Sequence, residues 1–328
     1  MGRKSNRKIE NQIKRVIVLV IILLVLAVAS KNGILENIEK DLTQIGILET
    51  VGEVKQNQEV DTKISENIVL DKNKLNILFF DVGQADSELI FYNGKTILID
   101  SGNTNDGENI VNGIKSLGIS KLDYVIGTHV HEDHIGGMSY IVDEIEIGNF
   151  YLPYNTKTTS SYYKRLLNSL TEKNIGIEEA TVGDKIQIDD LICEIMSVDN
   201  EEPEDANDAS IVTQITYGEL KYLFMGDATS RNENSREWED VDILKVGHHG
   251  SNTSSTERFL KQTLAEIAII PVGKENSYGL PKQEILNRLN NLGSKIYRTD
   301  IDGTIQILSD GKTNEVIKID VSFDGSEE

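Results

Sequence analysis

The five histidines of the chain are gathered in two short segments. One segment, THVHEDHIGG, holds His129, His131 and His134, and the other, LKVGHHGS, holds His248 and His249. Each segment follows an apolar run typical of a β-strand. Histidines that only filled core or surface positions would be scattered along the chain, so the clustering indicates a shared site. Because imidazole nitrogen is a frequent ligand of divalent metals, the sequence predicts a metal centre.

The spacing of the first segment predicts two neighbouring metal positions. Two histidines separated by one residue at a strand end, His129 and His131, can direct both imidazoles toward one point. Asp133 and His134 lie in the following turn, where two glycines allow a tight backbone, and can reach a second point. A carboxylate between the points would hold two ions about 3.5–4 Å apart, which suits hydrolysis. Asp227, at the end of the strand-like run YLFMGD, is the candidate for this bridge.

The body of the chain, residues 74–328, has the pattern of a layered α/β domain that would position these side chains. Short apolar runs alternate with helical stretches. Cys193, the single cysteine, lies in one such run, so we expect a small buried strand residue and no internal disulfide. Helices are expected near residues 108–117, 162–172 and 282–291. Strands are expected near residues 75–80, 88–92, 96–100, 124–126, 185–188, 192–197, 211–217, 220–225, 241–246, 267–271 and 305–308.

Residues 1–30 are predicted to be a signal peptide or a single transmembrane anchor. The opening is basic, and residues 16–29 form an unbroken apolar run. This run is shorter than the ~20 residues that span a bilayer. It suits the core of a signal peptide, for which Ala27 and Ala29 supply a small-x-small cleavage pattern. The alternative is an uncleaved anchor with its basic end inside the cell, and both interpretations place the body outside the cytoplasm.

Residues 31–73 are predicted to be a stalk or linker between that segment and the body. Ile34, Ile38, Leu42 and Ile45 recur at helical spacing and predict a short amphipathic helix. The stretch that follows, up to residue 74, is polar and has the composition of a solvated linker.

The charge of the chain weighs against strong passive binding of nucleic acid. The net charge is −21, and because the N-terminal residues are basic, the body is more acidic still. Proteins that bind nucleic acid usually present a basic footprint to the phosphate backbone.

The order of the motifs resembles the metallo-hydrolase domain of ComEC-type DNA-uptake proteins of bacterial competence. The motifs, in chain order from about residue 75 to residue 308, are FFDVGQADSELI, TILIDSG, THVHEDHIGG, NDASIV, YLFMGD, LKVGHHGS, NSYGLP and RTDIDGTI. The pattern H-x-H-x-D-H is diagnostic of the metallo-β-lactamase superfamily, and DVGQ and HHGS point to the ComEC-type branch. The resemblance implies a metallo-β-lactamase-like αββα sandwich with its metals at the edge between two sheets.

The resemblance also implies how the site is divided. One ion would be held by the H-x-H pair and the other by the following Asp-His pair. The implied metal ligands are His129, His131, Asp133, His134, Asp227 and His248. Asp133 and Asp227 are also candidates for orienting the attacking water, and His249 is either a ligand or a phosphate contact. Asp100, in LIDSG, is expected to brace the histidine loop, and Asp81 to play a similar supporting part.

Three positions depart from the family pattern. Ala85 stands where DVGQGD has its last glycine, and Leu280 stands where YGHP has histidine. The middle histidine of the superfamily has no counterpart, since the corresponding stretch offers only Asn207, Asp208 and Ser210.

Ser251 is either a substrate contact or the N-cap of the helix that follows. The candidate substrate-binding residues are Asn207, Ser210, Ser251 and Tyr278.

The sequence therefore predicts an extracytoplasmic hydrolase with two divalent ions, zinc or manganese. The favoured activity is that of a phosphodiesterase or nuclease with DNA as substrate, which follows from the resemblance alone. One alternative is a hydrolase of a small or envelope phosphodiester. Another is a non-catalytic metal-binding module that partners an envelope or competence complex. Contact with the membrane is expected through the N-terminal segment, and no protein partner is indicated.

Overall fold

A computed structural model describes residues 62–65, 67–153, 158–201 and 203–325 of the chain. The predicted signal peptide or anchor and the predicted amphipathic helix of the stalk lie outside these residues. Within the described part of the chain, no helix is both long and apolar enough to cross a membrane. One compact unit extends over Val60–Glu328.

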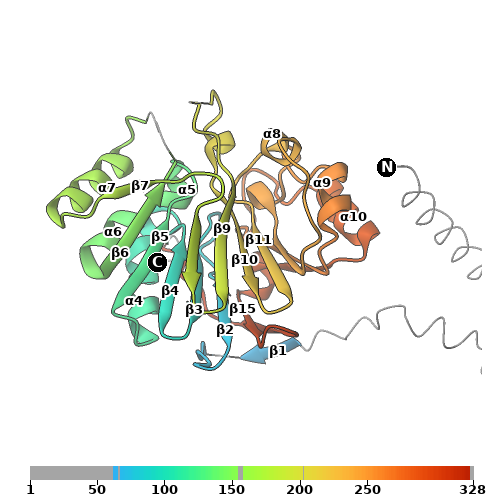
Figure 1. The fold of residues 1–328 in the computed structure, drawn as a ribbon, viewed down its shortest axis with the longest axis horizontal. Coiled ribbons are helices and arrows are strands. Elements are labelled where there is room, and N and C mark those ends of the chain that lie inside the picture. Colours follow the sequence, from blue (N-terminus) through green and yellow to red (C-terminus); the bar gives the residue numbers. More distant parts are fainter. Residues whose placement is uncertain (1–61, 66, 154–157, 202, 326–328) are drawn as a thin grey trace, which may run out of the picture. The chain divides into compact units, whose positions relative to one another are not determined.

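Two mixed β-sheets form the centre of this unit (Figure 1). The first has nine strands in the order β1-β16-β15-β2-β3-β4-β5-β6-β7, and the second has seven in the order β14-β13-β12-β11-β10-β9-β8. The strands of the first sheet are β1 (Thr62–Ser65), β2 (Leu75–Phe79), β3 (Glu88–Tyr92), β4 (Lys95–Ile99), β5 (Lys121–Ile126), β6 (Glu146–Leu152), β7 (Ile177–Glu179), β15 (Thr304–Ser309) and β16 (Asn314–Ile319). Those of the second are β8 (Lys185–Ile188), β9 (Leu191–Ser197), β10 (Val212–Tyr217), β11 (Leu220–Phe224), β12 (Ile243–Lys245), β13 (Ile267–Ile270) and β14 (Lys295–Arg298).

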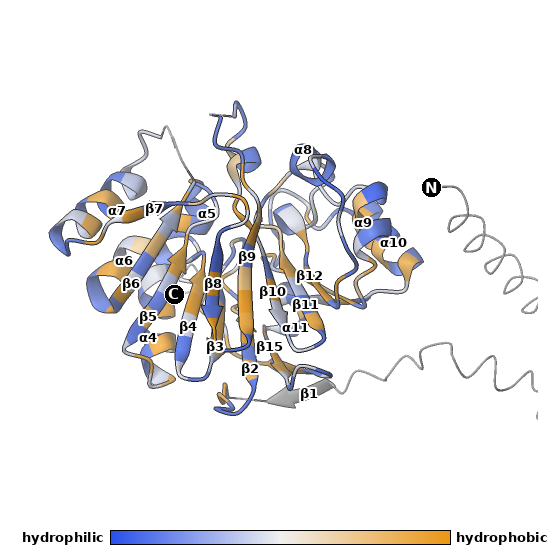
Figure 2. Ribbon diagram, viewed as in Figure 1, coloured by the Kyte–Doolittle hydropathy of each residue, from blue (hydrophilic) through white to orange (hydrophobic). Residues whose placement is uncertain are grey.

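Helices cover the outer faces of the two sheets. Those beside the first sheet are α4 (Gly107–Ser116), α5 (Glu132–Ile135), α6 (Met138–Glu144) and α7 (Ser161–Glu172). Those near the second sheet are α8 (Ser230–Asn234), α9 (Glu257–Thr263) and α10 (Gln283–Leu292), and α11 (Thr299–Asp302) lies between β14 and β15. Short 3-10 turns in the described part of the chain are η1 (Thr104–Asp106), η2 (Ala206–Ala209) and η3 (Gly247–Gly250). In Figure 2 the ribbons of α6, α7, α9 and α10 carry both hydrophobic and hydrophilic colours, as expected for helices with one buried face.

Three hydrophobic cores separate four layers. The middle core lies between the sheets, where Phe79 of β2 stacks on Phe224 of β11 with ring centroids 5.8 Å apart. A second core joins the first sheet to α4, α6 and α7, and a third joins the second sheet to α9 and α10. Strands buried on both faces read as continuous apolar runs, which is why β2 and β13 were predictable. The αββα arrangement expected from the resemblance is confirmed.

Several segments differ from the prediction. Within the predicted linker, Thr62–Ser65 forms β1 and pairs in parallel with β16, and Ile68 and Leu70 pack against the core under α4. The folded unit therefore begins before residue 74. Strands β6 and β16 were not predicted, because their sequences, EIGNFYL and NEVIKI, mix polar residues with apolar ones and only some of their side chains are buried. Cys193 is buried in β9 as predicted, and burial raises the pKa of its thiol to about 12.

Candidate metal centre

Loops from both sheets bring the predicted site residues to one edge of the sandwich. Asp100 follows β4 and the first histidine segment follows β5, in the first sheet. Asp227 follows β11, and the second histidine segment forms η3 after β12, in the second sheet. The loop around α5 is tight because a Cβ atom on Gly137 would collide with the carbonyl oxygen of Ser101. Both histidine segments therefore meet although 119 positions separate His129 from His248.

Four side chains form a compact group with the character of a metal site. The possible ligand atoms of Asp133, His134, Asp227 and His249 all lie within 4.8 Å of one another. His134 Nε2 is 3.3 Å from Asp227 Oδ1, and His249 Nε2 is 3.4 Å from Asp133 Oδ2. Among the described residues, His134 Nε2, Asp227 Oδ1 and His249 Nε2 are buried without a hydrogen-bond partner. Such atoms are destabilising by about 1–3 kcal/mol each unless something binds them, so the group fits a divalent ion.

The H-x-H pair lies beside this group. His129 Nε2 is 3.0 Å from His131 Nδ1, and the ring centroid of His129 is 4.1 Å from that of His134. Asp227 faces the second histidine segment as well, since its Oδ2 atom is 3.6 Å from His248 Nε2 and 3.8 Å from His249 Nε2. Asp227 thus lies between the two histidine segments.

The two adjacent histidines of η3 have different surroundings. His249 is buried, and its Nδ1 atom lies 3.0 Å from the carbonyl oxygen of Pro271. An Nδ1–H that donates to a carbonyl leaves Nε2 free to bind a metal. His248 is partly exposed, and its Nδ1 atom pairs with Thr253 Oγ1 at 2.9 Å. The four-residue group therefore contains His249, whereas the sequence analysis favoured His248 as the ligand.

Asp100 braces the histidine loop in the way the resemblance implied. Its carboxylate accepts hydrogen bonds from the backbone N–H of Thr128 at 2.8 Å and from Thr128 Oγ1 at 2.7 Å. It also pairs with His134 Nδ1 at 2.7 Å, which directs Nε2 of that histidine into the group.

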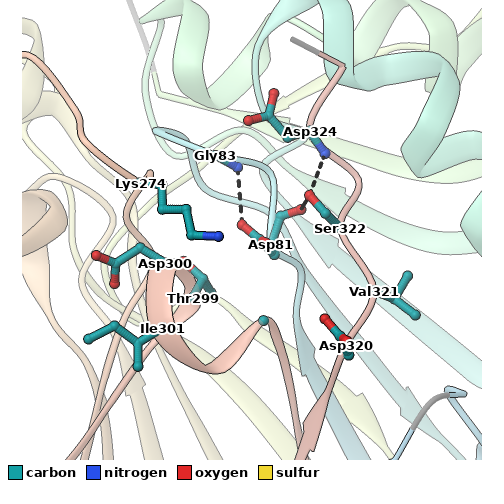
Figure 3. Close-up of a pocket in the computed structure, with 11 residues that line it drawn as sticks. Asp81, Gly83, Lys274, Thr299, Asp300, Ile301, Asp320, Val321, Ser322 and Asp324 are labelled. Atoms are coloured by element: carbon teal, nitrogen blue, oxygen red, sulfur yellow. Dashed lines mark hydrogen bonds between the residues drawn. The ribbon is translucent and has the colours of Figure 1, made fainter. Parts of the chain in front are cut away.

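Asp81 lines a different pocket from the candidate metal centre (Figure 3). Its carboxylate faces the backbone N–H of Gly83, and its carbonyl accepts from Ser322 and Phe323 of the C-terminal segment. Asp81 therefore holds the C-terminal segment in place.

Comparison with known proteins agrees with this geometry. Residues 80–274 match the sequence model of the Metallo-beta-lactamase superfamily. The chain belongs to this superfamily. The crystal structure of CmlA, a diiron beta-hydroxylase from Streptomyces venezuelae, matches with a TM-score of 0.50 and 11% identity over 73% of this chain and 55% of that chain. At that identity the likeness shows the metallo-beta-lactamase fold alone.

Curated relatives place the chain near the ComEC-type proteins. ComE operon protein 3 of Bacillus subtilis is 31% identical over 69% of this chain and 32% of its own length. Recombination protein 2 of Haemophilus influenzae is 30% identical over 69% of this chain and 28% of its own length. The resemblance to ComEC-type competence proteins is thereby confirmed. The chain spans about a third of the length of these relatives.

A cleft of about 320 Å³ opens onto the centre of this metallo-beta-lactamase domain. Asn207 lines it, is 8% exposed and has a buried Oδ1 atom without a hydrogen-bond partner. Tyr278 lines it with 68% of its surface exposed. The remaining lining residues are Gln84, His131, Glu132, Asp133, Asp227, His248, His249 and Leu280.

Ser210 and Ser251, the other two predicted substrate contacts, accept hydrogen bonds from backbone N–H groups. Ser210 Oγ accepts a hydrogen bond from the backbone N–H of Asp227 at 3.2 Å and is fully buried. Ser251 Oγ accepts from the backbone N–H of Thr253 at 3.3 Å. Ser251 is not the helix cap either, because Thr256 caps α9 by accepting from the backbone N–H of Phe259. Neither serine is among the residues that line the cleft, and both hydrogen-bond to backbone in the loops around the centre.

Sequence reasoning missed a buried ion pair behind the histidines. Lys245 of β12 is 1% exposed and donates to the carboxylate of Asp86, and Asp86 approaches both His134 and His249. Glu88 is buried next to this pair. The available signals were the acid in DVGQAD and a lysine inside the otherwise apolar strand run ILKV.

The charges in the group compensate one another. Burial alone would lower the pKa of His134 and of His249, but the surrounding carboxylates, Asp227 foremost, raise both well above the usual range. Burial alone would raise the pKa of Asp227, but His134 and His249 hold it well below its usual range. Burial lowers the pKa of His129, which keeps that imidazole neutral and suited to bind metal.

Proposed function

We propose that this domain is an extracytoplasmic binuclear metal-dependent phosphodiesterase that acts on DNA as a nuclease. The observation that carries the proposal is the convergence of buried, unpartnered ligand atoms on His134, Asp227 and His249 beside a cleft. All the donors are nitrogen or carboxylate oxygen, which suits two zinc or manganese ions.

The proposed ligand set follows the grouping of the side chains. Asp133, His134 and His249 would hold one ion, His129 and His131 the other, and Asp227 would bridge the two. Such ions supply an activated water and offset negative charge on phosphoryl oxygens. The arrangement supports His249 as the ligand and leaves the partly exposed His248 to contact the phosphate in the cleft.

The protein side chains orient the reaction. Asp227 Oδ2, 3.6 Å from His248 Nε2, is placed to accept a hydrogen bond from the attacking water and to keep that imidazole in position. Asn207 Oδ1 has an unused acceptor position in the cleft, which suits the N–H or O–H donors of a substrate. Tyr278 presents its ring at the cleft, where a nucleobase can stack.

DNA as substrate is supported by the relatives, whose names refer to the competence operon and to recombination. Exposure to the outside of the cell is supported by the apolar run in residues 16–29, which also suggests membrane attachment. A role in DNA uptake therefore forms part of the proposal.

A small or envelope phosphodiester is the second candidate substrate. The net charge of −21 favours it, because an acidic surface repels a polyanion more strongly than a small ester. A non-catalytic metal-binding module is favoured by Leu280, which lines the cleft where the family pattern has histidine.

One set of assays separates these functions. The full chain, loaded with zinc or manganese, is tested on duplex DNA, single-stranded DNA and a chromogenic phosphodiester. Asp227→Asn removes the bridge, and Asp143→Asn, an exposed carboxylate of α6, is the matched control. We expect metal-dependent DNA cleavage that Asp227→Asn reduces by about 10²-fold or more and Asp143→Asn leaves unchanged. Turnover of the small ester alone would support the second candidate, and bound metal without any turnover would support the binding module.

A further inference from the structure

Lys245 is an unusual residue for its position. It is the last residue of β12, a three-residue strand whose side chains are all buried, and only 1% of its surface is exposed. Among the described residues, no other lysine or arginine falls in the buried class. Removing an ammonium group from water costs on the order of several kcal/mol unless nearby negative charges compensate for the lost hydration. A lysine here therefore needs a reason beyond packing.

Its partners connect it to two loops of the metal centre. The ammonium group donates to the carboxylate of Asp86 and, at 3.0 Å, to the carbonyl oxygen of Gly226. Gly226 immediately precedes Asp227, the proposed bridging ligand. Burial alone would lower the pKa of Lys245, but Asp86 and Glu88 raise it, so the side chain stays charged.

Asp86 in turn reaches the far sides of two proposed ligands. Its Oδ1 atom is 3.4 Å from His249 Nδ1, and its Oδ2 atom is 3.8 Å from His134 Nδ1. Its backbone N–H donates to the carbonyl oxygen of Asp133 at 3.0 Å. A carboxylate behind an imidazole orients the ring and increases its strength as a ligand. For His134 and His249 the short Nδ1 contacts are those to Asp100 and to the Pro271 carbonyl, at 2.7 and 3.0 Å, so Asp86 supports both rings from slightly farther away, mainly through its charge.

The same carboxylate belongs to a second group of potential ligands, Asp86, Asp100 and His134. A third metal is not needed to explain this group. The ammonium of Lys245 already supplies a positive charge to Asp86, and His134 Nδ1 already pairs with Asp100 at 2.7 Å. Lys245 thus supplies to Asp86 the positive charge that a bound metal cation would otherwise supply.

We propose that Lys245 is a positioning residue of the metal centre, a fixed internal cation that holds Asp86 behind His134 and His249 and fixes the loop of Asp227. The inference rests on the proposed metal centre but concerns metal binding and not the substrate. Without this cation, Asp86 would lose its compensating charge and both histidines would lose a fixed support.

The test compares metal binding by the full chain and by Lys245→Met. Bound zinc or manganese is counted after dialysis, and affinity is measured by competition with a chromogenic chelator. We expect two ions in the parent chain and a 10–100-fold loss of affinity for one of them in Lys245→Met, the size of loss typical when support behind a ligand is removed. The matched control is Lys185→Met, a strand lysine that pairs with Glu194 at 3.0 Å on the surface, and it should bind metal normally.

A double variant separates positioning from simple stabilisation. Lys245→Met alone leaves Asp86 buried without its partner and is expected to be unstable, so Asp86→Asn/Lys245→Met replaces the pair by neutral groups of similar size. We expect the double variant to recover thermal stability without metal but not metal affinity. Recovery of both would overturn the proposal, as would normal metal affinity in Lys245→Met. If the parent chain binds two ions without hydrolysing any substrate, the phosphodiesterase proposal fails while the metal-binding test of Lys245 stands.

Discussion

At the scale of single residues, the centre depends on side chains held by a strained turn. His248 and His249 have consecutive φ values of 52° and 50°, in the left-handed region that residues other than glycine rarely adopt. Each such residue costs on the order of 1–3 kcal/mol and persists only where the surroundings enforce it. The turn buries the imidazole of His249 within the four-residue group and leaves that of His248 partly exposed.

Alanine variants of the two histidines should therefore have different effects. His249→Ala is expected to lower metal affinity by about 10–100-fold, because it removes a proposed ligand. His248→Ala should keep both metals and lower kcat for phosphodiester hydrolysis. Metal content and steady-state kinetics measured on the same preparations check this. Normal metal content in His249→Ala, with loss in His248→Ala, would instead support the assignment favoured by the sequence.

Residue type and spacing were enough to predict most of the side chains that the fold brings together at this edge. Imidazoles are rare and chemically specific, so the clustering of His129, His131 and His134 was informative. Asp86 and Lys245 were missed because a carboxylate and a lysine are ordinary in a sequence, and only burial and mutual contact make them unusual here. The choice between the two histidines of η3 depended on backbone dihedral angles, which no sequence pattern specifies.

At the scale of elements, one side chain fixes the loop that presents Tyr278. Asn276 Nδ2 donates to the carbonyl oxygens of Gly273 and Leu280 at 2.9 and 2.8 Å, and its Oδ1 atom accepts from the backbone N–H of Leu280 at 3.0 Å. Lys282 Nζ adds a hydrogen bond to the carbonyl oxygen of Tyr278 at 2.7 Å. A loop held this way presents its exposed tyrosine with little loss of entropy on binding.

Asn276→Ala should therefore weaken binding of substrates that have a base to stack. We expect KM for single-stranded DNA to rise several-fold, within the range of about 1–3 kcal/mol found for lost stacking. KM for the chromogenic diester should change less. Tyr278→Ala should reproduce the effect and Tyr278→Phe should not. Equal effects of Asn276→Ala on both substrates would show that the loop supports the centre itself and not the base.

Asp106, next to α4, makes the attachment of the C-terminal segment sensitive to pH. Its carboxylate accepts from the backbone N–H groups of Asn103 at 2.6 Å and of Gly325 at 2.9 Å, and burial raises its pKa to about 6. The folded state therefore retains a proton that the unfolded chain releases near the ordinary pKa of 3.8. The associated stability is present below pH 3.8 and is lost as pH rises to about 6.

The variant Asp106→Asn should remove this dependence. Relative to the parent chain, its free energy of unfolding should rise between pH 4 and pH 6 and then stay constant, since the amide never ionises. Urea unfolding of both chains at a series of pH values measures the difference in their free energies of unfolding. Contributions from other titrating groups are the same in both chains and cancel in this difference. Parallel profiles for the two chains would show that Asp106 does not titrate in this range.

At the scale of the whole molecule, the layers of the fold could be predicted more fully than the residue at which the folded unit begins. The buried strands were visible as apolar runs, and their alternation with helices indicated a layered α/β domain, whereas the two sheets of the sandwich were implied by the resemblance. The pairing of β1 with β16 was not predictable, because a four-residue polar segment has no periodic signal of its own and forms a strand only beside its partner. The backbone hydrogen bonds of Ser210 and Ser251 were not predicted, because sequence order shows proximity to a motif but not the direction of a side chain.

The overall charge leads to a test with salt. A protein of net charge −21 and polyanionic DNA repel each other at long range, and this repulsion is screened at higher ionic strength. We expect kcat/KM for single-stranded DNA to increase as salt is raised from about 0.01 to 0.15 M, where the screening length falls from about 30 to 8 Å. The chromogenic diester should show a weaker dependence. A decrease for DNA would reveal a local basic track that outweighs the net charge.

The division of the ligands between two sheets links metal loading to folding order. His134 comes from a loop of the first sheet and Asp227 and His249 from loops of the second, so neither sheet alone holds the four-residue group. Contacts between residues so far apart in sequence form late in folding, because closing long loops is entropically costly. An ion that binds only when the two sheets are packed together would then stabilise the complete fold and slow its unfolding. Under the proposed export across a membrane, metal would be acquired at the destination and not at the ribosome.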